Sequence, residues 1–463
     1  MGKPRLRVPP HRSSALRRVA WAVALLITGT TSALAQPEPE AAPAAATAPV
    51  MPALSHVVTE AAGSVAPRAA GAVVVGAPLK SDTPAPRGPA LVSRLVGLVA
   101  GAIGPAARAV RNPMPLDAAR AEAATSPALV YVQVEVANGE LRLTVDAYPI
   151  PRNIWDRSRS GSPGPIAHGF GSARIDAEVR TFLAPIALIA ANPVKVPLPT
   201  TEVMAMACED IDNDGALELF LMSRRTLALG RVRNNQFVVL RQVAWQELSP
   251  IAPIPWRQPL ATLSAGAPGL LDVGLTDRAQ SVRLDAQLVK VAAYDDMPVP
   301  VPGGTVCAKR RVGSLTAELG PCLPQDHIAS PNAAFHFDAV AAARVIGTGG
   351  DVRDVWAVRS PTDGSVALRD DHGKQHALQH VGAQLALADV DLDGDPDLVA
   401  SKNVLNASND ALVIRSWRSN GTMEKRAELP VPDGISAVVV CPPDGPGQRT
   451  VAVATSKELW ILR

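Results

Sequence analysis

Aromatic side chains are scarce in this sequence of 463 residues, because Trp, Tyr and Phe together account for 3% of it. Proteins that bind single-stranded nucleic acid stack its bases on aromatic side chains within a basic groove. The sequence has no basic stripe with interleaved aromatics, and its 45 Lys and Arg residues nearly balance its 43 Asp and Glu residues. Composition therefore excludes nucleic acid as the expected partner and weakens the case for a sugar-stacking surface.

The motifs of several enzyme classes are also absent. The sequence has no Gly-x-Ser-x-Gly elbow, no Gly-x-x-x-x-Gly-Lys-Ser/Thr loop and no Gly-x-Gly-x-x-Gly after a strand. It has neither His-Glu-x-x-His nor a Cys-x₂-Cys pair, the usual signals for zinc. His372, His376 and His380 recur every four residues, but Gly373 would interrupt a helix, so we interpret them as a loop or outer strand. We therefore expect a protein that is not an enzyme.

Residues 1–35 have the three parts of a secretory signal peptide. Six basic residues precede an apolar core at Val19–Ile27, and a run of small residues ends at Ala35, where we expect cleavage. No later apolar run is long enough to span a bilayer, and the core itself is short for an uncleaved anchor. The mature chain would carry 39 basic and 43 acidic residues. The protein is therefore expected in the periplasm or secreted.

The four cysteines fit an oxidising compartment. Cys307 and Cys322 bracket a short loop, and a disulfide between them would contribute about 3 kcal/mol by chain entropy. Cys208 and Cys441 each end an apolar run just before a candidate loop. A bridge between them would join the first and last repeats of the chain, but we favour two buried free thiols.

Two stretches of the chain share one acidic pattern. They run from Asp210 to Glu218 and from Asp389 to Asp397, with acidic residues at loop positions 1, 3, 5 and 9 and Gly at position 6. Ca²⁺ takes six to eight oxygens at about 2.3–2.6 Å, and Gly permits a sharp turn with positive φ. Four carboxylates so close together would repel one another without a cation. The pattern predicts two calcium loops, and the alternative is a pair of solvated acidic turns.

These loops differ from an EF-hand, which needs a bidentate Glu at position 12 and a helix on each side. Position 12 is Leu221 in the first loop and Ala400 in the second. The segments that follow are short and apolar, which indicates strands. We therefore expect the carboxylate at position 9 to close each site, between two β-strands.

The pattern resembles the FG-GAP (VCBS-type) repeat of integrin-like β-propellers and secreted bacterial proteins. In that family the side chains at positions 1, 3, 5 and 9 and the carbonyl at position 7 bind Ca²⁺. In the first loop the resemblance implies the ligands Asp210, Asp212, Asp214, Glu218 and the Ala216 carbonyl. In the second loop it implies Asp389, Asp391, Asp393, Asp397 and the Asp395 carbonyl. Up to two structural ions are therefore expected, the first held less tightly because Glu218 replaces the family's usual Asp.

Residues 36–68, ahead of these loops, are rich in Pro and Ala, and this composition predicts a disordered tether. A small α/β domain is expected at 69–200, with an irregular C-terminal segment. Its expected strands are 72–78 and 107–110, its helices 91–103 and 116–124, and its hairpin pairs 129–136 with 141–148.

From residue 201 to 463 the chain is a series of short strands and turns. Three degraded copies of the loop-bearing unit, at 265–276, 345–358 and 438–455, each have a strand, a Gly-rich turn and a second strand. A spacing of about 40–50 residues is typical of propeller blades, and the one longer gap holds the Cys307–Cys322 insertion and room for a further unit. We therefore expect a mostly β protein with a propeller of about five to six blades. The alternative is a β-sandwich carrying two calcium loops.

The order of signal peptide, α/β domain and propeller is similar to that of TolB-type periplasmic proteins, an analogy of architecture alone. The leading hypothesis is an exported, non-catalytic, calcium-binding propeller that acts as an interaction or envelope scaffold for another protein or envelope component. The alternative is an exported hydrolase or lyase that acts on polysaccharide and holds structural calcium, which would need carboxylates converging in a central cleft. A third possibility is an adhesion protein that binds its ligand through the calcium ion itself.

Overall fold

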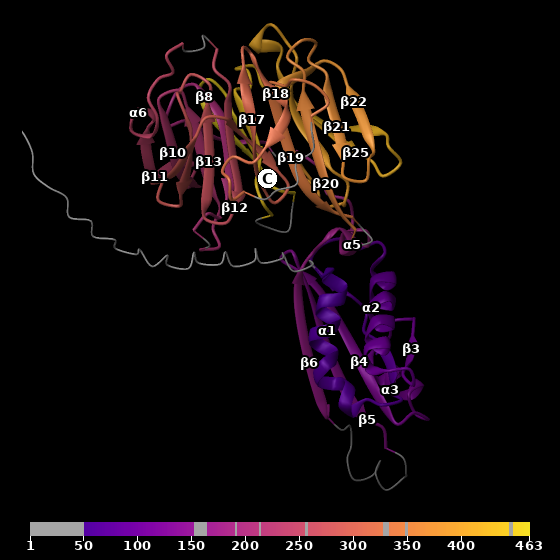
Figure 1. The fold of residues 1–463 in the computed structure, drawn as a ribbon. Coiled ribbons are helices and arrows are strands. Elements are labelled where there is room, and N and C mark those ends of the chain that lie inside the picture. The colour runs from indigo at the N-terminus through magenta and orange to yellow at the C-terminus, as the bar shows by residue number, and fades with distance from the viewer. Residues whose placement is uncertain are drawn as a thin grey trace, which may run out of the picture. The chain divides into compact units, whose positions relative to one another are not determined.

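The computed structural model describes residues 51–151, 164–189, 192–212, 214–254, 258–326, 333–347, 351–443 and 448–463. The expected signal peptide and the first part of the expected tether lie outside these ranges. The described residues form an α/β module and a six-bladed β-propeller (Figure 1). Among them, no helix combines the length and the apolar composition that a membrane crossing needs.

The α/β module is built on one mixed sheet. Its strands lie in the order β3-β1-β4-β5-β6, with β2 paired to β4; β1 is parallel to β3 and β4, whereas β4, β5 and β6 are antiparallel. The strands are β1 (Val73–Gly76), β2 (Lys80–Ser81), β3 (Arg108–Val110), β4 (Ala128–Ala137), β5 (Glu140–Pro149) and β6 (Ala167–Arg174). The helices are α1 (Ala53–Val65), α2 (Gly88–Ile103), α3 (Leu116–Glu122) and α5 (Ala177–Arg180), and a 3₁₀ turn spans Ala66–Arg68. The expected strands, helices and hairpin of this region are thus present.

Helix α1 lies within the segment expected to be a tether, so that expectation is wrong for residues 53–65. Its apolar residues recur at helical spacing and are buried, together with α2, against one face of the sheet. Gly169 of β6 permits this packing, because a Cβ atom there would lie 1.9 Å from the Ala61 carbonyl oxygen of α1. The small α3 covers the opposite face beside Tyr131.

Within the described residues the propeller has six sheets, five of four strands and one of three. Blade 1 contains β8 (Val203–Glu209), β9 (Glu218–Ser223), β10 (Thr226–Arg233) and β11 (Gln236–Ala244), with the short helix α6 (Trp245–Leu248) after it. Blade 2 contains β12 (Ala261–Ala267), β13 (Leu270–Leu275), β14 (Ser281–Asp285) and β15 (Lys290–Tyr294), and blade 3 contains β16 (Met297–Val301), β17 (Gly304–Arg311) and β18 (Ser314–Gly320). Blade 4 contains β19 (Ala339–Ile346), β20 (Val352–Arg359), β21 (Val366–Asp370) and β22 (Gln375–Leu378). Blade 5 contains β23 (Val381–Ala388), β24 (Asp397–Lys402), β25 (Ala411–Trp417) and β26 (Met423–Pro430), with a 3₁₀ turn at Ala407–Asn409. Blade 6 contains β27 (Ala437–Val440), β28 (Val451–Ala454), β29 (Glu458–Leu462) and β7 (Val194–Pro197).

The innermost strands form a closed ring. Each of β8, β12, β16, β19, β23 and β27 packs against the next, and β27 packs against β8. Strand β7 precedes blade 1 in the chain yet pairs antiparallel with β29 as the outer strand of blade 6. The propeller therefore begins at Val194, earlier than expected, and its last blade is completed by the strand that enters the first. A ring closed in this way rules out the sandwich alternative.

A disulfide between Cys208 and Cys441 also joins the first and last blades. Cys208 lies on β8 and Cys441 directly follows β27, the two innermost strands that meet where the ring closes. Our expectation of free thiols at these positions is therefore wrong. Burial predicted for both cysteines is confirmed, but the ring brings them together across 233 residues of sequence.

Blade 3 occupies the long gap between the recognisable repeats. The expected disulfide between Cys307 and Cys322 is present and ties β17 to the chain that leaves β18. The three degraded copies also fall where expected, at the first two strands of blades 2, 4 and 6. The described residues thus contain all five predicted units and one that was hidden.

Candidate metal-binding loops

Each acidic loop connects the innermost strand of its blade to the second strand. The first loop lies between β8 and β9 in blade 1, and the second lies between β23 and β24 in blade 5. Position 6 has the expected positive φ in both, 84° at Gly215 and 88° at Gly394. The strand–loop–strand setting expected from the sequence is therefore confirmed.

The two loops share one hydrogen-bond pattern. The carboxylate at position 1 accepts from the backbone amides of positions 5 and 6, the carboxylate at position 9 accepts from the amide of position 2, and the carboxylate at position 5 accepts from the amide of position 7. The acceptors are Asp210, Glu218 and Asp214 in blade 1, and Asp389, Asp397 and Asp393 in blade 5, at 2.8–3.0 Å. The loops are therefore two copies of one structural unit.

Three of the predicted ligands converge in each loop, those at positions 1, 3 and 9. Carboxylate oxygens of Asp210, Asp212 and Glu218 all lie within 4.8 Å of one another, as do those of Asp389, Asp391 and Asp397. Oxygens that share one Ca²⁺ at about 2.5 Å can lie at most about 5 Å apart. Both triads are therefore close enough to bind one ion.

The carboxylates at position 5 do not join these triads. Asp214 instead pairs with Arg231 at 2.7 Å, and Asp393 pairs with Arg418 at 2.6 Å. Ala216 and Asp395, the predicted carbonyl ligands, donate their backbone amides to the position 5 carboxylates, and ligation by their carbonyls stays a prediction.

The blade 5 triad is deeply buried. Asp389, Asp391 and Asp397 are 5%, 2% and 0% exposed. Burial, with a further contribution from Asp397, raises the pKa of Asp389 to about 8. Burial, with a contribution from Asp391, raises the pKa of Asp397 to about 7. Burial also raises the pKa of Asp391, because the buried charge is costly without a cation.

Arginines surround the outside of this loop. Arg418 pairs with Asp393 and Asp395, and Arg426 donates to Asp391 Oδ2 at 2.7 Å. Arg353 of blade 4 donates to the Gly394 carbonyl at 2.6 Å. Two more arginines, the buried Arg180 and the partly buried Arg449, are attracted to the triad, Arg180 mainly to Asp391 and Arg449 mainly to Asp389. Burial lowers the pKa of both arginines, and the attraction opposes that effect.

The blade 1 loop is more exposed and has its own arginine. The side chains of Asp212 and Asp214 are 47% and 46% exposed, whereas Glu218 is buried. Arg231 contacts all three of these residues. Burial raises the pKa of Glu218, and Arg231 opposes that shift.

The sequence prediction missed the arginines that pair with the loop carboxylates from within the same blade, Arg231, Arg418 and Arg426. They lie on the third and fourth strands of the same blades, at Arg231 on β10 and Arg426 on β26, with Arg418 directly after β25. Each lies more than ten residues beyond the loop that it contacts, so the nine-residue acidic pattern does not contain it. The register of β9 against β10 places Arg231 opposite Glu218, and no pattern within the loop contains this information.

The blade 5 triad fits a hard divalent cation. Its donors are carboxylate oxygens, the type that Ca²⁺ prefers. Asp391 Oδ1 is buried and has no hydrogen-bond partner within the described residues, and buried oxygens of this kind are normally satisfied. A bound ion would supply the missing partner and the positive charge, and so hold the β23–β24 turn together.

The central channel is lined mainly by small apolar residues of the innermost strands. It has two open regions, of about 350 and 550 Å³. Among the described residues, its ionisable groups include Glu209 and Arg344 in one region and Glu202 and Asp338 in the other. Arg344 is paired with Asp354, and Asp338 with Arg359. The described lining therefore does not bring several free carboxylates together.

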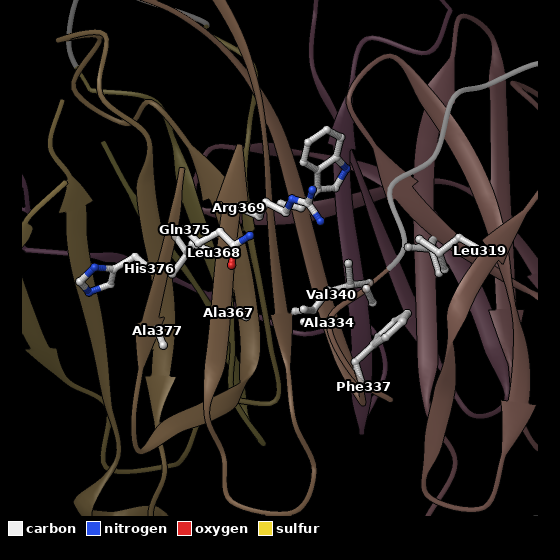
Figure 2. A pocket seen from close by; sticks show the side chains of 14 residues that line it. Leu319, Ala334, Phe337, Val340, Ala367, Leu368, Arg369, Gln375, His376 and Ala377 are labelled. Carbon is white, nitrogen blue, oxygen red and sulfur yellow. The ribbon is translucent and has the colours of Figure 1, made fainter. Parts of the chain in front are cut away.

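A separate pocket of about 320 Å³ lies between blades 3 and 4. Leu319 and Phe337 lie on one side of it, and Ala367 and Ala377 lie on the other (Figure 2). Blade 3 has no fourth strand among the described residues, which leaves β21 and β22 of blade 4 uncovered there. The lining is mostly apolar, and within the described chain it contains no carboxylate. The pocket therefore does not have the paired acids of a polysaccharide hydrolase.

No known protein family and no curated protein matches the chain. Solved structures with similarity include a catalytically inactive virginiamycin B lyase from Staphylococcus aureus with quinupristin, at 8% identity and a TM-score of 0.32, covering 72% of this chain and 94% of that one. A streptogramin B lyase has 12% identity and a TM-score of 0.30, covering 70% and 90%. TolB from Acinetobacter baumannii has 10% identity and a TM-score of 0.27, covering 85% and 94%. At these values the similarity carries no inference about function.

Proposed function

We propose that this protein is an exported, non-catalytic β-propeller whose fold is stabilised by calcium and which serves as an interaction scaffold. The buried carboxylate triad of blade 5, with its unsatisfied Asp391 oxygen, is the observation that carries the proposal. The resemblance of the loops to FG-GAP repeats supports it. Asp389, Asp391 and Asp397 would hold the ion, with the Asp395 carbonyl as a further ligand.

Export and scaffolding have independent support. Two disulfides favour an oxidising compartment, in agreement with the signal peptide expected at residues 1–35. A propeller offers loops at both ends of its strands, and the partner would be another protein or a component of the cell envelope. An enzyme acting on polysaccharide would need converging free carboxylates, and the described channel lining supports this alternative less well.

Thermal unfolding of chelator-treated protein, with and without added CaCl₂, tests the calcium proposal. Extracellular calcium modules bind at about 10⁻⁴–10⁻³ M, so 10 mM Ca²⁺ would add about 1.4–2.7 kcal/mol. For a domain of this size that is a rise in Tm of roughly 3–10 °C. The Asp391→Asn variant should lose the response, and the control Asp371→Asn, an exposed acid of the β21–β22 turn, should keep it. A wild-type Tm that changes with neither added CaCl₂ nor EDTA would refute the proposal.

A further inference from the structure

One position on the third strand distinguishes the two acidic loops. In blade 5, Ser416 of β25 pairs directly across from Asp397, the carboxylate at position 9. In blade 1, Leu219 pairs with Gly230, so the next residue of β10, Arg231, lies across from Glu218 at position 9. Equivalent positions thus hold a hydroxyl in one loop and a guanidinium in the other.

Arg231 contacts most of the carboxylates of its loop. It forms ion pairs with Glu218, with Asp214 at 2.7 Å and with Asp212 at 3.6 Å. Two of these residues, Asp212 and Glu218, belong to the triad with Asp210. The Arg231 side chain is 13% exposed, so its charge is held against the loop. A guanidinium in this place supplies the positive charge that an ion would otherwise bring.

In blade 5 the residue at the equivalent strand position, Ser416, is uncharged. Its hydroxyl donates a hydrogen bond to Asp397 Oδ1. The arginines of this blade contact other carboxylates of the loop. Arg418 pairs with Asp393 and Asp395. Arg426 of β26 donates to Ser416 Oγ at 3.2 Å and pairs with Asp391 Oδ2 at 2.7 Å and with Asp393 at 3.5 Å, and among the described residues no arginine pairs with Asp389 or Asp397 within 4 Å. Asp391 Oδ1, on a side chain that is 2% exposed, still has no hydrogen-bond partner among the described residues. The blade 5 triad therefore keeps an oxygen that is ready to bind an ion.

We propose that Arg231 is the built-in cation of the blade 1 loop, and that Ser416 keeps the blade 5 loop open, so that the protein binds one divalent cation and not two. This inference rests on the proposed function for the blade 5 site. An ion entering blade 1 would have to displace a largely buried arginine from three carboxylates. Arg231 and Ser416 are thus the residues that decide which copy of the loop takes the metal.

Calorimetric titration of chelator-stripped, full-length protein with CaCl₂ tests the assignment through an exchange of the two residues. Wild type should bind one ion per chain, Arg231→Ser should bind two, and Ser416→Arg should bind none. Arg231→Ser combined with Asp212→Asn should return to one. The matched control Arg241→Ser, an exposed arginine on β11 of the same blade, should stay at one.

The possible failures are distinguishable. Two ions in wild type, or one in Arg231→Ser, would overturn the assignment and leave the blade 5 proposal intact. No ion in wild type but one in Arg231→Ser would support the role of Arg231 and overturn the calcium site of blade 5. Ser416 is fully buried and Ser416→Arg can misfold, so circular dichroism checks each variant and the Arg231→Ser result decides the assignment alone.

Discussion

Removing the Cys208–Cys441 disulfide should destabilise the protein more than removing Cys307–Cys322. The first bond joins residues 233 positions apart, and the second joins residues 15 positions apart. Chain entropy gives about 5 kcal/mol for the long loop and about 3 kcal/mol for the short one. In the folded ring the pairing of β7 with β29 still completes blade 6 when the long-range bond is gone. The main effect should therefore be the greater freedom of the unfolded chain.

Urea unfolding of the Cys208→Ala/Cys441→Ala and Cys307→Ala/Cys322→Ala variants, each with the other disulfide intact, measures this difference. Each variant loses two sulfur atoms, and three of the four cysteines are buried while Cys322 is partly buried. Most of the packing cost of the substitutions therefore cancels when the two variants are compared. We expect the long-range variant to be less stable by about 2 kcal/mol, the difference between the two loop entropies. Equal losses of stability, or a larger loss in the short-loop variant, would refute the view that the Cys208–Cys441 bond acts by restricting the unfolded chain.

Two further predictions concern stability. In EDTA, the raised pKa values of Asp389 and Asp397 mean that the folded protein holds protons that the unfolded chain has already lost. The free energy of unfolding should therefore fall as pH rises from 5 to 7.5, by up to about 1.4 kcal/mol per pH unit for each group. Urea unfolding at the two pH values measures this slope, which saturating calcium should reduce; greater stability at pH 7.5 in EDTA would contradict it. Gly266→Ala should cost about 1–3 kcal/mol in the same assay, because a Cβ there would lie 2.2 Å from the Gly304 carbonyl group of the next blade. The control Gly97→Ala, on an open face of α2, should be neutral or stabilising, and equal losses would argue against this close approach of blades 2 and 3.

The sequence predicted blades best where a turn signal separated two apolar strands. Gly215 and Gly394 lie in the positive-φ region, as position 6 of the pattern requires. Blade 3 was hidden because its first strand contains Pro298 and Pro300, which count against a strand. Those prolines are tolerated on β16 because it is the innermost strand and pairs on one side only, with β17.

The misses have a common cause, since each depends on partners far away in the sequence. Helix α1 has a Pro- and Ala-rich neighbourhood that looks like a linker, and its burial depends on β5 and β6 about a hundred residues later. Strand β7 reads as part of an irregular segment until the ring brings β29 beside it. The pairing of Cys208 with Cys441 follows from the same closure. Local patterns identify a blade, but they do not show which strands meet when the ring closes.

The same limit applies to the acidic loops, because the residues that face their carboxylates lie on strands outside the loop pattern. In both loops the carboxylates at positions 1 and 9 accept backbone amides across the turn, so these acids are needed for the loop conformation itself. The residue that faces position 9 differs between the loops: it is Arg231 in blade 1 and Ser416 in blade 5. On our proposal, a count of acidic loops gives an upper limit on the number of bound ions, and the residue across from position 9 would decide whether a given loop binds one.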